Sequence, residues 1–228
     1  MLVTYTEEHW RLLKEKRARA ARIMELLAAS HIESYTYGSL ARGDVTYRSD
    51  IDVFVPTHVP LLRVEEAIRN SLPVHSRLIV QATPTHAPKG YIFLNPEETE
   101  MVSFPLAPLT PREEEFYRFG GLVSLKELRE GRRVPGVDKR LIFISPTTEG
   151  HVELPVKGRE AEVASRLGIS IETVRERVRV LSRRSSIGRT GVFVKYYLMP
   201  HQGFEEAIHL LARQRRPFLQ VLKARGVL

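Results

Sequence analysis

Apolar residues along the first half of the chain alternate between helical and strand spacing. Residues 6–30 carry apolar side chains three, four or seven positions apart, which is typical of one face of a helix. Shorter apolar or alternating runs, bounded by proline, glycine and polar turns, indicate strands. We expect helices at 6–30 and 61–72, and strands at 31–37, 50–55, 77–83, 91–95 and 100–104. Strands and helices mixed in this order predict an α+β fold built on a mixed sheet.

The segment 110–131 is expected to be mainly helical and to pack on the sheet. The pattern after it differs from that of the first half. Strands at 140–145 and 151–156 are predicted to pair with each other. Two short helices, 160–167 and 171–181, are joined by a turn at Gly168, and Ser170 suits the N-cap of the second one. Two helices joined by a glycine turn are typical of a helix-turn-helix, and the β-run at 192–198 resembles the wing of a winged helix-turn-helix. Amphipathic helices at 204–213 and 217–225 suit core packing or a dimer interface.

Composition describes an ordinary globular chain, with 43% hydrophobic and 27% charged residues among 228. The net charge of +8 is uneven, because residues 151–228 hold 15 Lys/Arg against 7 Asp/Glu, whereas residues 1–150 hold 20 of each. A basic last third favours a polyanionic partner, most simply nucleic acid. There are no cysteines, no signal-peptide pattern and no membrane-length apolar run. We therefore expect a cytoplasmic protein, and few amides with many Arg and Glu suggest a thermophile.

The chemistry concentrates where the first two predicted strands meet. Gly38 lets a backbone approach a phosphate closely, and the Ser39 hydroxyl can donate to one. Asp50 and Asp52 lie two apart on a strand, so both side chains project from one face. Two carboxylates held close together favour a bound cation, and hard oxygen ligands completed by substrate phosphates suit Mg²⁺. The stretch predicts a metal–nucleotide site.

This combination of Gly-Ser, a short spacer and Asp-x-Asp resembles the polymerase-β nucleotidyltransferase superfamily, and is closest to its minimal members from archaea and bacteria. The resemblance covers about residues 30–105 and is carried by Gly38, Ser39, Arg42, Gly43, Ser49, Asp50 and Asp52. It implies nucleotide binding by Gly38, Ser39, Arg42 and Ser49. Arg42 would either neutralise phosphate charge or support an acidic side chain, and Ser49 would orient the aspartate strand.

The superfamily resemblance also implies a third carboxylate on a neighbouring strand, sharing a metal ion with the aspartate pair. Glu100 is our candidate because it opens the predicted strand at 100–104, and Glu98 is the fallback. Family members carry this acid deeper in the strand, at a position that Val102 would occupy here. The expected catalytic and metal-binding set is therefore Asp50, Asp52 and Glu100.

Two basic surfaces are candidates for nucleic acid. The helix at 6–30 has a face with Arg11, Lys14, Lys16, Arg17, Arg19 and Arg22, which is either a nucleotide or nucleic-acid face or an ordinary solvated one. In the helix-turn-helix, arginines line the outer face of the second helix and lead into the wing. The predicted DNA-binding residues are Thr173, Arg175, Arg177, Arg179, Arg183, Arg184 and Arg189.

We thus expect a palm-like nucleotidyltransferase domain at 1–131, a winged helix-turn-helix at 132–200 and two amphipathic helices at 201–228. The expected activity is Mg²⁺-dependent transfer of a nucleoside monophosphate from an NTP to a hydroxyl acceptor, with DNA bound by the C-terminal part. A homodimer or a toxin-type protein partner remains open. The alternatives are a DNA-binding regulator whose nucleotidyltransferase domain senses nucleotide or is inactive, and a purely structural partner of another protein.

Overall fold

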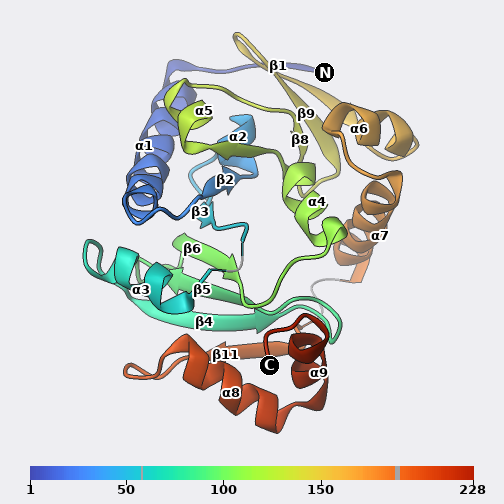
Figure 1. Cartoon of the computed structure of the whole chain (residues 1–228). Coiled ribbons are helices and arrows are strands. Elements are labelled where there is room, and N and C mark those ends of the chain that lie inside the picture. The colour runs from blue at the N-terminus through green and yellow to red at the C-terminus, as the bar shows by residue number, and fades with distance from the viewer. Residues whose placement is uncertain (58, 188–190) are drawn as a thin grey trace. The chain divides into compact units, whose positions relative to one another are not determined.

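The computed structural model describes residues 1–57, 59–187 and 191–228. Its secondary structure is α+β with a mixed sheet, which confirms the predicted class (Figure 1). The chain divides into two compact units that are interleaved along the sequence. Unit 1 comprises Met1–Arg22, Tyr35–Ile51 and Thr110–Thr190, and unit 2 comprises Ile23–Ser34, Asp52–Leu109 and Gly191–Leu228. This differs from the three consecutive domains expected from the sequence.

Unit 1 contains a four-stranded antiparallel sheet in the order β1-β10-β9-β8, formed by β1 (Leu2–Thr4), β8 (Gly136–Val137), β9 (Ile142–Thr147) and β10 (Gly150–Pro155). The predicted pairing of the segments near 140 and 151 is confirmed by the β9–β10 hairpin, in which Val152 lies opposite Ser145. Gly150 is required where β10 meets β1, because a Cβ there would lie 1.9 Å from the Val3 carbonyl oxygen. The first residues of the chain are thus tied into this sheet.

A second strand pair and a set of helices complete unit 1. β2 (Tyr35–Tyr37) pairs antiparallel with β7 (Leu122–Ser124). The sequence had led us to expect mainly helix at 110–131 and did not predict β7. The helices are the first part of α1 (Glu7–Ala29), α2 (Ser39–Arg42), α4 (Pro111–Gly120), α5 (Leu125–Arg129), α6 (Glu160–Leu167) and α7 (Ile171–Ile187).

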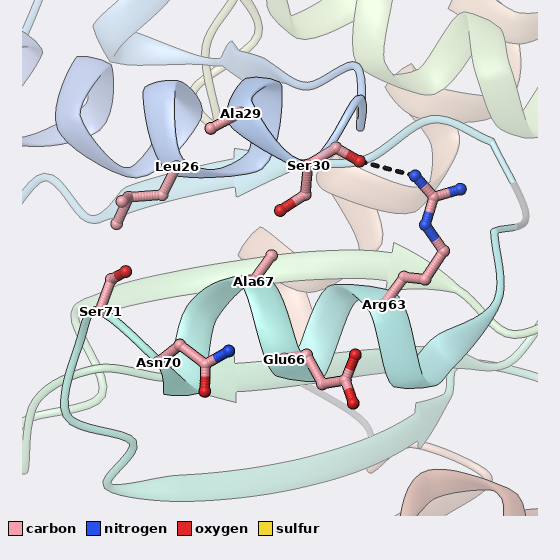
Figure 2. Close-up of a pocket in the computed structure, with 8 residues that line it drawn as sticks. All are labelled: Leu26, Ala29, Ser30, Arg63, Glu66, Ala67, Asn70 and Ser71. Atoms are coloured by element: carbon pink, nitrogen blue, oxygen red, sulfur yellow. Dashed lines mark hydrogen bonds between the residues drawn. The ribbon is translucent and has the colours of Figure 1, made fainter.

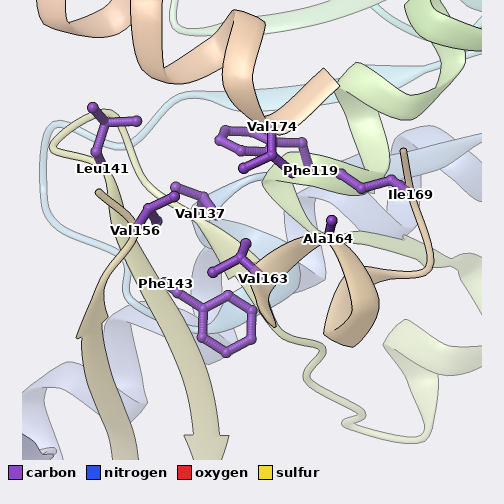
Figure 3. Packing of buried hydrophobic residues seen from close by; sticks show 9 residues of the cluster. All are labelled: Phe119, Val137, Leu141, Phe143, Val156, Val163, Ala164, Ile169 and Val174. Atoms are coloured by element: carbon purple, nitrogen blue, oxygen red, sulfur yellow. The ribbon is translucent and has the colours of Figure 1, made fainter. Parts of the chain in front are cut away.

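One apolar core joins the β8–β10 strands to α4, α6 and α7. Figure 3 shows its side chains converging between the hairpin and the two helices, and its members are Phe119, Val137, Leu141, Phe143, Val156, Val163, Ala164, Ile169 and Val174. Val174 of α7 is fully buried here, and Ser170 caps that helix by accepting a hydrogen bond from the Thr173 N–H at 3.3 Å. The predicted pair of helices and its N-cap are therefore present.

Unit 2 is built on five strands in the order β11-β4-β5-β6-β3: β3 (Ile51–Phe54, of which Ile51 belongs to unit 1), β4 (Ser76–Gln81), β5 (Lys89–Phe93), β6 (Glu100–Pro105) and β11 (Val194–Tyr197). Its helices are the last turns of α1, α3 (Leu61–Arg69), α8 (Phe204–Gln214) and α9 (Arg216–Ala224). Phe204 of α8 packs edge-on against Phe104 of β6, with ring centroids 5.1 Å apart. Helix α8 therefore covers the sheet face that carries Phe104.

The predicted wing is wrong. The segment at 192–198 forms β11, which pairs antiparallel with β4, Val194 opposite Gln81 and Tyr197 opposite Leu78. Burial alternates along β11, with Val194 buried and Lys195 exposed. A wing hairpin and a sheet-edge strand share this alternation, so the pattern alone did not distinguish them. The edge of β4 supplies the backbone partners that a wing would have found in its own hairpin.

Candidate functional site

The Gly-Ser turn lies between β2 and the short helix α2, in unit 1. Gly38 has φ 73° and ψ −138°, a conformation that only glycine adopts readily. Its N–H donates to the Gly121 carbonyl at 3.0 Å, which fixes the turn against β7. A Cβ built on Gly38 would meet nothing within 4 Å, so one side of the turn is open space. The turn is therefore held by β7 on one side and open at the position where a Cβ would project.

Hydroxyl groups connect this turn to the aspartate motif. The Ser39 hydroxyl donates to the Ser49 hydroxyl at 3.1 Å, and the Ser49 oxygen also accepts from the Thr46 N–H at 2.9 Å. Ser49 precedes Asp50, whose side chain is exposed. These hydrogen bonds tie the segment that leads into the aspartates to Ser39.

Arg42 is an internal support of unit 1. Its side chain is 5% exposed, and its Nε and Nη2 each donate to one carboxylate oxygen of Asp44 at 3.0 Å. Its Nη1 donates to the carbonyls of Gly120 at 2.6 Å and Val137 at 3.3 Å. Of the two roles that the sequence left open for Arg42, these contacts correspond to supporting an acidic side chain. They leave the guanidinium little capacity to bind phosphate.

Asp52 is held from the neighbouring strands of unit 2. The Ser103 hydroxyl on β6 donates to its Oδ1 at 2.7 Å. Tyr91 of β5 lies directly opposite Ser103. Burial, and then the nearby negative charge of Asp52, raise the pKa of the Tyr91 hydroxyl well above its usual value. The three side chains therefore share one face of the sheet, and the carboxylate of Asp52 is half-buried and oriented there.

Glu100 does not occupy the position expected for a third carboxylate. It lies three residues before Ser103 on β6, so its side chain projects from the opposite face of the sheet, the face that carries Phe104. The fallback residue Glu98 is bound elsewhere, because its carboxylate accepts from Ser76 at 3.0 Å and from the Tyr197 hydroxyl at 3.1 Å. The neighbour that β6 presents to Asp52 is Ser103, which sequence reasoning missed because it considered only the alternate positions of that strand.

Asp50 and Asp52 are the carboxylates in this region that could hold a metal ion. In the part of the chain that the structure describes, no three His, Cys, Asp or Glu side chains form a group that could hold a metal ion. The oxygen-only donor pair Asp50 and Asp52 nevertheless fits a hard divalent cation, since such an ion is commonly bound by one or two carboxylates with waters and substrate phosphates. The residues present thus suit a site completed by a nucleotide.

The predicted DNA-binding residues of α7 separate into two groups. Thr173 is buried, and its hydroxyl donates to the Glu115 carboxylate on α4, which also accepts from the Ser170 hydroxyl at 2.6 Å. Arg177 lies over the Phe116 ring, with its guanidinium carbon 4.8 Å from the ring centroid. Burial, and then the positive charge of Arg184, lower the pKa of Arg177. These contacts correct the prediction for Thr173 and Arg177, because both side chains pack towards α4 and are not presented to DNA.

The other arginines of α7 remain at the surface. Arg175, Arg179, Arg183 and Arg184 are exposed, and the first three recur every four residues along one face. Arg189 lies outside the described residues. The basic face of α7 is thus narrower than the sequence suggested.

A separate hollow in unit 2 lies between the end of α1 and α3, with a volume of about 330 Å³ (Figure 2). Arg63 reaches across it and donates to the Ser30 carbonyl at 2.6 Å. Glu66 is the one carboxylate in its lining, which has no second acid or histidine to form a metal or acid–base pair. This hollow carries no recognisable chemistry.

One of three comparisons with known proteins gave a match, and it includes the Gly-Ser and Asp-x-Asp motifs. A family model described as "Nucleotidyltransferase domain" matches residues 18–98, a range that includes Gly38, Ser39, Asp50 and Asp52. No curated protein and no solved structure matches the chain. Among the described residues, no helix has the length and apolar character needed to span a membrane.

Proposed function

We propose that the chain transfers a nucleoside monophosphate from an NTP to a hydroxyl acceptor, using Mg²⁺ held by Asp50 and Asp52. The match of residues 18–98 to a nucleotidyltransferase family model supports nucleotidyl transfer in general and an NTP substrate. The observation that carries this proposal is the hydroxyl link from Ser39 to Ser49, which connects the open Gly38 turn to the aspartate motif.

In this mechanism the triphosphate binds at the open side of Gly38, and the Ser39 hydroxyl turns from Ser49 to donate to a phosphate oxygen. The oxygen of the acceptor hydroxyl attacks the α-phosphorus, the bond from that phosphorus to the bridging oxygen breaks, pyrophosphate leaves, and the acceptor's proton passes to water. Bound Mg²⁺ would lower the pKa of the acceptor hydroxyl and neutralise charge on the triphosphate. Ser103 keeps one oxygen of Asp52 in a fixed orientation.

The test follows label from each α-labelled NTP onto protein, RNA, DNA and small hydroxyl compounds. We expect Asp52→Asn to abolish transfer while circular dichroism and the thermal midpoint remain those of a folded protein. Glu149→Gln, which changes an exposed carboxylate outside the motif, serves as the control and should keep full activity. A fully active Asp52→Asn variant would contradict the proposal.

A second candidate is a DNA-binding regulator that binds nucleotide without transferring it. The observation in its favour is Ser103, because the neighbour of Asp52 on β6 is a hydroxyl and not a carboxylate. Exposed Arg175, Arg179 and Arg183 on α7 supply a basic face for DNA. This candidate requires nucleotide binding without release of pyrophosphate, together with DNA binding that weakens steeply with salt. Arg175→Ala/Arg179→Ala should abolish that DNA binding, and unchanged binding would exclude the helix α7 as its surface.

A further inference from the structure

Lys16 projects from α1 to the segment that precedes the aspartates. Its Nζ donates to the Ser49 carbonyl at 2.7 Å and lies 3.5 Å from the Tyr47 carbonyl. The side chain is half-buried, and both α1 at this position and the Ser49 segment belong to unit 1. The ammonium is thus fixed beside the serine whose hydroxyl bonds Ser39.

Lys16 has charged neighbours of both signs. Burial lowers the pKa of Lys16, the positive charge of Arg19 lowers it further, and the negative charges of Asp50 and Glu15 partly oppose both effects. The ammonium of Lys16 is therefore repelled by one neighbouring cation, and a bound phosphate would relieve that repulsion. An ammonium has three N–H donors, and Lys16 makes one short hydrogen bond.

The other basic side chains that contact this turn are committed internally. Arg42 is occupied by Asp44 and two carbonyls. Arg17 is buried and donates to the Leu40 carbonyl at 2.8 Å and the Ala41 carbonyl at 3.1 Å, the carbonyls of α2. A triphosphate next to Gly38 needs a cation that it can reach, and among these three side chains Lys16 is the one that is not buried.

We propose that Lys16 binds the β- and γ-phosphates of the NTP and stays bound to the pyrophosphate as it leaves. This assignment rests on the proposed function, because it concerns the same nucleotide. It adds a residue from α1 that lies before the matched range 18–98. Negative charge on the pyrophosphate increases as the bond to the α-phosphorus breaks, so a fixed ammonium stabilises the transition state more than the bound substrate.

The experiment measures binding of inorganic pyrophosphate, of NTP and of the matching nucleoside monophosphate to the full-length protein in Mg²⁺ by calorimetry. The variants are Lys16→Ala, Lys16→Gln and Lys16→Arg, with Lys14→Ala, an exposed lysine of the same helix, as the matched control. Lys16→Gln keeps an N–H donor for the Ser49 carbonyl without the charge. The thermal midpoint of each variant is first compared with that of the wild type. If Lys16→Ala does not fold, Lys16→Gln takes its place.

We expect loss of the charge to weaken binding of pyrophosphate and NTP roughly ten- to a hundredfold, the range for one charge-assisted hydrogen bond. Binding of the monophosphate should change less than about threefold, Lys16→Arg should retain most of the affinity, and Lys14→Ala should match wild type. Equal losses for monophosphate and pyrophosphate would overturn the proposal, because they would mean that Lys16 acts only by positioning Ser49. If the wild type binds NTP and Lys16→Ala binds NTP and pyrophosphate equally well, the role of Lys16 is refuted and the proposed function is not. Absence of NTP binding by the wild type would instead refute the proposed function and this inference together.

Discussion

Arg42→Ala tests whether the arginine of the Gly-Ser motif supports the fold or contacts phosphate. The side chains of Arg42 and Asp44 are only 5% and 13% exposed, and the two hydrogen bonds between them are parallel and 3.0 Å long. Removing one partner of a buried pair costs about 3–5 kcal/mol, because the other charge is left unpaired. The carbonyls of Gly120 and Val137 lose a donor as well, and water entering the vacated space compensates part of that loss. We therefore expect Arg42→Ala to lower the free energy of unfolding by about 4 kcal/mol.

The assay is urea unfolding followed by circular dichroism, combined with NTP binding below the unfolding transition. Arg132→Ala is the control, because Arg132 makes a 2.9 Å ion pair with Glu127 while 61% exposed, and such a surface pair contributes about 0–1 kcal/mol. Arg42→Lys should lose about 2 kcal/mol, since a lysine cannot make the two parallel bonds. Arg42→Met/Asp44→Leu should be more stable than Arg42→Met alone, because it leaves no unpaired charge. If Arg42→Ala kept the wild-type unfolding midpoint and lost NTP binding, our assignment of Arg42 as a support would be wrong.

Two further variants test the capping of α7 and the neighbour of Asp52. Burial raises the pKa of Glu115, but hydrogen bonds from Ser170 and Thr173 outweigh it and hold that pKa below its usual value. Its stabilising effect is therefore present above the unfolded-state pKa and is lost as the pH falls through the folded-state pKa. Glu115→Gln should cost roughly 1–3 kcal/mol at neutral pH, and the difference from wild type in urea unfolding should shrink on acidification; a difference that grew in acid would contradict the capping role. Ser103→Asp would place a third carboxylate beside Asp52, so it should destabilise the metal-free protein and increase Mg²⁺ affinity about tenfold in calorimetry, whereas Ser103→Asn should not.

Local patterns predicted most of the secondary structure of the chain. Apolar spacing located α6 at its observed bounds and placed the β9–β10 hairpin to within two residues. The turn at Gly38 was also readable, because its positive φ favours glycine. What these features share is that they depend on neighbours in the sequence.

The remaining features depend on partners that are far apart in the sequence. β11 alternates as a wing would, and only the edge of β4 determines that it joins unit 2. Thr173 and Arg177 occupy positions of a recognition helix, yet Glu115 and Phe116, more than fifty residues earlier, bind them. Ser103 carries no signal of its own, because a serine in an apolar strand gains meaning only when its hydroxyl reaches Asp52 on another strand. Strand order and helix docking decided each of these cases.

The interleaving of the two units has a consequence for how the protein is made. The chain passes from one unit to the other after residues 22, 34, 51, 109 and 190, so no single cut separates them. During synthesis, unit 2 lacks β11, α8 and α9 until the last segment emerges from the ribosome, and β4 has an unpaired edge until then. Unpaired strand edges invite aggregation, so protein truncated before residue 191 should accumulate as inclusion bodies even though the matched nucleotidyltransferase range is complete. Fragments of this protein for laboratory use therefore need residues 191–228.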